Sequence, residues 1–236
     1  MQIRRLGVLL LLLWAMPQVF AQTGLELGAK YIPQTVWHFN NADFSEGDKL
    51  NFTPTYTRAY GLHFGVNFSD FFGVQSGYIL SEQGQKYVHK HVGSAESSEI
   101  RLSYRKIPLL LKFNTDPISG ISFIANAGLQ LGVLTEATYL ENNESVDLGI
   151  DYTDWYNNTD VSVLLGAGAR FNVSEVLNFD LMLRTDYSIR DIENKSFDGG
   201  LNQQPLVWQI NELENRGNTH NFTAGVQLGV NFLFAR

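Results

Sequence analysis

Eight stretches of this chain alternate bulky apolar residues with small or polar ones, and this period of two constrains the fold more than any other feature. In the last stretch, residues 222–234, every even position is apolar, while Gly225, Gln227, Gly229 and Asn231 lie between them. A period of two places the two sets on opposite faces of a strand. Bulky apolar residues on the outside and glycines on the inside are typical of a barrel surrounded by lipid.

The sequence therefore predicts an all-β fold, an eight-stranded antiparallel transmembrane β-barrel of the outer-membrane type with meander topology. The predicted strands are 24–32, 59–68, 72–80, 100–113, 121–135, 161–171, 177–189 and 222–234. The connections alternate between long polar segments (33–58, 81–99, 136–160 and 190–219) and short ones (69–71, 114–120 and 172–176). Such barrels have short periplasmic turns and long external loops, so both termini are expected in the periplasm.

One predicted strand changes its alternation. Between residues 100 and 104 the apolar side chains occupy even positions, and from Ile107 to Phe113 they occupy odd positions. Because proline is tolerated in strands mainly at edges and bulges, this change predicts a β-bulge beside Pro108.

The N-terminus has the composition of an export signal. Arg4 and Arg5 precede an apolar run that ends at Trp14, and Val19 and Ala21 are small residues at a cleavage position. The sequence predicts a secretory signal peptide over 1–21 and one β-barrel domain over 22–236. The run is too short for a transmembrane helix. The chain has no cysteine, hence no disulfide, and its net charge of −7 argues against binding to nucleic acid.

Charged residues of both signs are expected to point into the barrel. Charges inside a low-dielectric wall are tolerated when they are paired, so the set predicts a structural salt-bridge network. The alternative is an ion-selective path through a narrow porin-like channel. An eight-stranded interior is only just wide enough for side chains to fill, which favours the network. The predicted set is Glu26, Lys30, Arg101, Arg105, Arg170, Asp180, Arg184 and Asp186.

The third long loop is acidic and aromatic. Tyr152, Trp155 and Tyr156 lie among carboxylates, and we expect them to form an external contact patch for a protein partner or, alternatively, to cap the barrel mouth. No twelve-residue calcium loop is present. In the second loop His89 and His91 would share a face of an extended segment, but further ligands at recognisable spacing are missing. No metal and no cofactor are predicted.

Catalysis is not expected either. His220 is the only histidine predicted to face outward near the long-loop rim, and no outward serine lies beside it. The alternative of a lipid-modifying outer-membrane enzyme would need such a pair. A soluble lipocalin-type barrel would need the inside and outside of every strand reversed.

Residues 104–113, Tyr-Arg-Lys-Ile-Pro-Leu-Leu-Leu-Lys-Phe, resemble the Ile-Pro-Leu-Leu-Leu-Lys strand of PorT-like outer-membrane β-barrel proteins of the Bacteroidetes. Segments 127–132, 165–171 and 187–192 are also similar to that family. The resemblance implies an outer-membrane location, contact with outer-membrane lipids and the barrel assembly machinery, and no catalytic residues. One class of members assists a secretion system. The expected function is thus non-enzymatic, through the extracellular loops or as an accessory of an envelope or secretion machine. The chain departs from the family in ending Phe234-Ala235-Arg236 rather than on an aromatic residue.

Overall fold

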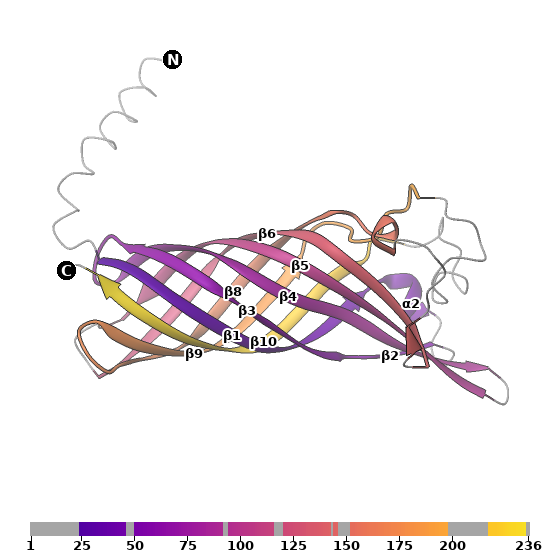
Figure 1. The fold of residues 1–236 in the computed structure, drawn as a ribbon, viewed down its shortest axis with the longest axis horizontal. Helices are drawn as coiled ribbons and strands as arrows, with labels where there is room; N and C mark the ends of the chain where they lie inside the picture. Colours follow the sequence, from indigo (N-terminus) through magenta and orange to yellow (C-terminus); the bar gives the residue numbers. More distant parts are fainter. Residues whose placement is uncertain are drawn as a thin grey trace, which may run out of the picture.

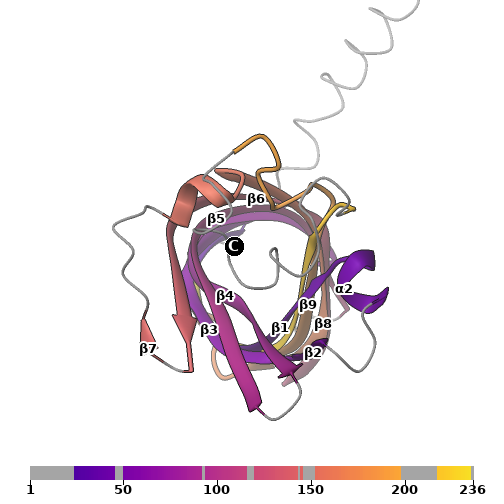
Figure 2. The same cartoon turned by 90° about the vertical axis from the view of Figure 1, so that its right-hand side faces the viewer.

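A computed structural model describes residues 24–45, 50–91, 94–115, 120–142, 144–145, 152–197 and 217–234. The predicted signal peptide lies outside these residues, as do the side chains of His89 and His91. Long antiparallel strands form an elongated barrel, and a view along its axis shows a ring (Figures 1 and 2). The strands of the ring are β1 (Gly24–Phe39), β3 (Thr55–Asn67), β4 (Phe72–His91), β5 (Ser94–Asn114), β6 (Ile121–Glu141), β8 (Thr159–Asn172), β9 (Leu177–Ser188) and β10 (His220–Phe234).

The ring closes because the first and last strands pair. Each of these strands is antiparallel to the next one along the chain. β10 then returns to β1 in a register that runs from Leu25 with Phe234 to Phe39 with His220. The predicted eight-stranded antiparallel meander is confirmed.

The two ends of the barrel differ. The short connections lie at one end, called here the turn end, and the long connections lie at the other, the loop end (Figure 1). The small additional elements all belong to the loop end. They are α2 (Asn41–Ser45), β2 (Leu50–Thr53) on the edge of β4, β7 (Glu144–Ser145) beside β6, and a 3₁₀ turn (Tyr152–Trp155). No helix within the described residues is long and apolar enough to cross a membrane.

Two of the short turns are built alike. The Ser69 hydroxyl oxygen accepts hydrogen bonds from the backbone N–H groups of Phe71 and Phe72. Ser174 does the same for Val176 and Leu177 in the turn between β8 and β9. In each turn an acidic residue follows the serine, which places Asp70 and Glu175 at equivalent, exposed positions.

The outer face of the barrel is apolar along its turn-end half. Leucine and phenylalanine side chains of every ring strand stand exposed there, among them Leu27, Phe64, Leu111, Leu129, Leu165, Leu183 and Leu228. In water such a continuous surface would drive aggregation. The inner face has the glycines: a Cβ atom on Gly28 would lie 2.5 Å from Cε1 of His63. Glycine therefore leaves room for polar side chains inside a narrow ring.

The predicted bulge beside Pro108 is wrong. β5 alternates without interruption, and its register with β4 is the same on both sides of the proline, where Ser76 pairs with Leu109 and Ile79 with Lys106. The bulge lies in β6 instead, because Ser103 pairs with Glu136 while Tyr104 pairs with Leu134. Thr135 is the extra residue, and its hydroxyl donates to the Ser103 carbonyl oxygen at 3.0 Å.

Candidate functional site in the barrel interior

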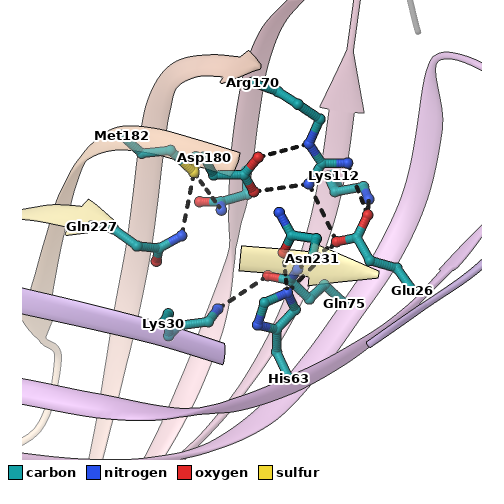
Figure 3. A network of polar contacts seen from close by, with 11 residues as sticks. Glu26, Lys30, His63, Gln75, Lys112, Arg170, Asp180, Met182, Gln227 and Asn231 are labelled. Carbon is teal, nitrogen blue, oxygen red and sulfur yellow. Dashed lines mark hydrogen bonds and ion pairs between the residues drawn. The ribbon is translucent and has the colours of Figure 1, made fainter. Parts of the chain in front are cut away.

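An ion-pair network crosses the interior near the turn end (Figure 3). Arg170 of β8 donates to Asp180 of β9 through Nε (2.7 Å) and Nη2 (2.8 Å), and to Oε2 of Glu26 through Nη1 (2.8 Å). Lys112 of β5 donates to the same Glu26 oxygen at 2.6 Å. The Arg170 and Glu26 side chains are 3% and 0% exposed. Such buried charges are tolerated because each finds an opposite charge with good geometry.

Neutral and basic side chains extend this network. Lys30 donates to the amide oxygen of Gln75 at 3.3 Å, and Gln75 donates to Glu26 at 3.3 Å. Nε2 of His63 lies 2.7 Å from the side-chain oxygen of Asn231 and 3.6 Å from Glu26. Among the described residues no carboxylate forms an ion pair with Lys30, so its amine is hydrogen-bonded but not charge-paired.

A second polar layer lies closer to the loop end. Nζ of Lys106 on β5 donates to Oδ2 of Asp186 on β9 at 3.0 Å. Arg184 donates to the Gln130 amide oxygen at 2.6 Å. Further along, Asn221 of β10 donates to Gln83 of β4 at 2.8 Å.

Several of these contacts join walls that face each other. Lys106 and Asp186, Glu26 and Lys112, and Asn221 and Gln83 each belong to strands three places apart in the ring of eight. These side chains therefore reach across the interior at three levels.

The loop end is filled differently, by an apolar cluster. Trp155 of the 3₁₀ turn is fully buried and meets Phe197 edge to face at 4.8 Å. The rest of the cluster comes from the 3₁₀ turn, the segment after β9, β2 and the inner faces of β4, β5 and β6. It comprises Leu50, Tyr87, Ile100, Leu102, Tyr104, Leu134, Tyr139, Tyr152, Tyr156 and Ile192.

The structure places most, but not all, of the expected inward charges inside. Glu26, Lys30, Arg170, Asp180, Arg184 and Asp186 are buried in the interior. The expectation for Arg101 and Arg105 is wrong: both are exposed on the outer face, and Arg101 pairs there with Glu99 at 2.6 Å. The inward expectation for these two arginines depends on a phase change that β5 does not have. The unbroken alternation also brings Lys106 and Lys112 inside, two cations that do not belong to the predicted inward set.

The expected contact patch in the third long loop is also wrong. Tyr152, Trp155 and Tyr156 are at most 7% exposed and belong to the apolar cluster, so they pack against the barrel mouth rather than offering a surface. This agrees with the alternative expectation that these three residues cap the barrel mouth. Large aromatic side chains bury the most apolar area, which explains why this loop folds back onto the strands.

The contacts that the structure describes for the outward-facing His220 are with an aromatic ring and a backbone carbonyl group. His220 stacks on Tyr187 with ring centroids 5.4 Å apart, and its Nδ1 lies 3.0 Å from the Ser188 carbonyl oxygen. The Ser188 hydroxyl points inward and donates to Asp160. Within the described part of the chain, no three His, Cys, Asp or Glu side chains are grouped so that they could hold a metal ion.

A family model agrees with this architecture. Residues 20–194 match the family model described as "Outer membrane protein beta-barrel domain". No curated protein matches the chain significantly. Among solved structures, Neisserial surface protein A has 12% identity and a TM-score of 0.48, covering 89% of this chain and 97% of its own. Ail of Yersinia pestis has 14% identity and a TM-score of 0.44, covering 90% and 99%. OprG of Pseudomonas aeruginosa has 12% identity and a TM-score of 0.45, covering 92% and 97%.

Proposed function

The chain belongs to the outer membrane protein β-barrel domain family, and we propose that it is a PorT-like, non-conducting and non-enzymatic barrel that serves an envelope or secretion machine through its external surface. Its place is the outer membrane. In such barrels the short turns face the periplasm, so the loop end described above is the external end.

The observation that carries this proposal is the set of contacts across the interior. The layer of Arg170 and Glu26, the layer of Lys106 and Asp186, and the contact between Asn221 and Gln83 follow one another along the axis. An eight-stranded barrel has little more room than its own side chains need. Solutes would have to break several buried ion pairs to pass, which disfavours a channel.

The external surface offers a region for contact with a partner. β4 and β5 have 20 and 21 residues, about twice the 9–11 that a membrane-spanning strand needs. The surplus extends the barrel wall beyond the bilayer on the loop side. Its outer face carries Tyr56, which is 83% exposed, and the exposed Arg58, Glu82 and Arg101. We assign partner contact to this wall instead of the buried Tyr152, Trp155 and Tyr156.

Conductance tests the closed interior. The purified barrel in a planar lipid bilayer is expected to show no steady single-channel steps, because the ion pairs span the interior. Regular conductance steps would contradict the proposal and favour the porin-like alternative. Incubation with purified outer-membrane lipid, followed by mass spectrometry, is expected to leave the lipid unchanged; a shortened or transferred acyl chain would favour the enzyme alternative instead.

Photo-crosslinking tests the external wall. A photoreactive amino acid at position 56, in intact cells, is expected to capture one envelope protein reproducibly, since Tyr56 is 83% exposed at the loop end of β3. The same group at position 165, where Leu165 faces the membrane, serves as the matched control. Equal capture from both positions, or from neither, would contradict a partner site on the wall.

A further inference from the structure

A cavity of about 540 Å³ opens at the turn end of the barrel, inside the ring. Its inner end is formed by Lys112 and Arg170 of the ion-pair network, together with Asn114 and Asn178, and its rim includes Asp70 and Glu175 of the two alike turns. This volume lies within the roughly 300–1,000 Å³ of small-molecule sites. The cavity, called here the vestibule, is separate from the external wall proposed above.

Polar groups at the inner end of the vestibule have unused hydrogen-bonding capacity. Asn114 is only 8% exposed, yet its side-chain oxygen has no hydrogen-bond partner among the described residues. Among the described residues Lys112 donates one hydrogen bond, to Glu26, whereas an ammonium group has three N–H donors. Buried polar groups are normally paired, so a free acceptor beside free donors points to a ligand that supplies both partners.

The charges of the vestibule are divided along its depth. The network behind its inner end contains three basic side chains, Lys30, Lys112 and Arg170, and two carboxylates, Glu26 and Asp180. The rim carries two exposed carboxylates, those of Asp70 and Glu175. A basic inner end and an acidic rim match a ligand that has a negative charge at one end and a positive charge at the other.

We propose that the vestibule binds a short peptide with both termini free, taken up from the periplasm. The carboxylate enters first and accepts hydrogen bonds from Lys112. A backbone N–H of the peptide donates to the side-chain oxygen of Asn114. The terminal ammonium group remains at the rim, where Asp70 and Glu175 supply negative charge. A long protein tail would lack the ammonium group there, so the site selects short peptides.

Calorimetry with three matched peptides tests the charge division. The full chain, refolded in detergent, is titrated with tetra-alanine, with N-acetyl-tetra-alanine and with tetra-alanine amide. Tetra-alanine is expected to bind. The amide is expected to bind more than tenfold weaker, because it loses the charge-assisted contact with buried Lys112. The acetylated peptide is expected to bind about three- to fivefold weaker, since the rim is exposed. No heat of binding, or equal affinity for all three peptides, would overturn the proposal.

Rim variants give an independent readout. Replacing both rim acids (D70N with E175Q) is expected to abolish the preference for tetra-alanine over its acetylated form. The hydroxyl groups of Ser69 and Ser174 hold the turns, so the fold should survive, which boiled and unboiled gel migration checks. E136Q, which removes an exposed acid at the far end of the barrel, is the matched control and should keep the preference. An unchanged preference in the rim variant would overturn the proposal, and if that variant does not fold, the three wild-type titrations decide.

Discussion

The two halves of the barrel interior are filled by opposite chemistry. Near the turn end, Arg170, Glu26 and Asp180 fill the ring with ion pairs. At the loop end, Trp155 and Tyr104 fill it with an apolar cluster. The outer surface shows the reverse arrangement, with exposed leucines around the charged half and exposed arginines and glutamates around the apolar half. Each half therefore has an interior whose polarity is the opposite of its surroundings.

The change of medium explains this difference. A strand segment inside the bilayer gains by facing lipid with apolar side chains, which leaves polar ones for the interior. Beyond the bilayer the same strand faces water, so its apolar side chains are best buried inside, as in a soluble protein. β5 shows both regimes within one alternation, with Leu102 inside and Leu109 outside.

Removing Arg170, the cation at the centre of the ion-pair network, should cause the largest loss of unfolding free energy in the charged half. Arg170→Met leaves the buried Asp180 without an ion-pair partner among the described residues, and leaves Glu26 with Lys112 and the more distant His63. Breaking a buried ion pair from one side costs about 3–5 kcal/mol, because an uncompensated charge remains. Urea unfolding in lipid vesicles, followed by gel migration, measures this loss of unfolding free energy.

Lys30→Met is the matched control for that change. Lys30 is as deeply buried but makes one hydrogen bond, to Gln75, and no ion pair within the described residues. Its removal leaves no carboxylate without a partner, so stability should be unchanged or higher. Equal losses of unfolding free energy in both variants would show that the volume of the side chains, rather than their charge pairing, stabilises this half of the interior.

The apolar half should respond to a cavity instead. Trp155→Ala removes a fully buried ring from the cluster. Truncating a buried tryptophan to alanine lowers the unfolding free energy by about 3–5 kcal/mol. Because Trp155 packs at the loop end, we expect the loss to open the 3₁₀ turn and its neighbours while the barrel persists. Added protease should cut the variant near residues 152–156 in intact cells, with unchanged heat-modifiable migration of the barrel core. Loss of the barrel itself would show that the two halves fold as one unit.

The outer surface of the charged half is tested by a charge placed against lipid. Leu165→Arg, on the outer face of β8, should cost about 2–4 kcal/mol near the bilayer midplane and impair insertion. Val173→Arg, in the turn after the same strand, should cost only about 0–1 kcal/mol because it meets the interface. The two variants are compared by the urea concentration at which each unfolds from vesicles; similar midpoints would place Leu165 outside the hydrocarbon layer.

Alternation alone was enough to predict the ring and its short turns, because lipid outside and polar groups inside give every span the same pattern. The strands run further toward the loop end than predicted, as in β4, which spans Phe72–His91 rather than 72–80. Alternation failed where the medium changes. The rule that apolar residues face lipid, applied to the whole of β5, predicts an outward Ile100, Leu102 and Tyr104. The same rule predicts a bulge at Pro108, which the strand does not have. The same error placed Arg101 and Arg105 inside.

The loop residues failed for a related reason. The sequence shows three aromatic residues in this loop, Tyr152, Trp155 and Tyr156. Only tertiary packing decides whether such residues at a barrel mouth are exposed or fold back onto Leu102 and Tyr104. The partners of Arg170 could be predicted as a class, since paired charges were expected. Their identities depend on cross-ring distances, and a strand pattern does not contain those distances.

Two neighbouring residues of β5 test the comparison through the smallest expected effect. Arg105 is exposed on the outer face, whereas Lys106 is buried and bonded to Asp186 at 3.0 Å. Arg105→Gln should change the unfolding free energy by no more than about 0.5 kcal/mol, as is usual for surface substitutions. Lys106→Gln should cost more, since it removes the nearest cation from a buried carboxylate. Urea titrations of the two variants side by side decide the point. A larger loss of unfolding free energy for Arg105→Gln would mean that the inner and outer faces of β5 are exchanged near residue 105. Tyr104 and the apolar cluster around it would then have to face outward.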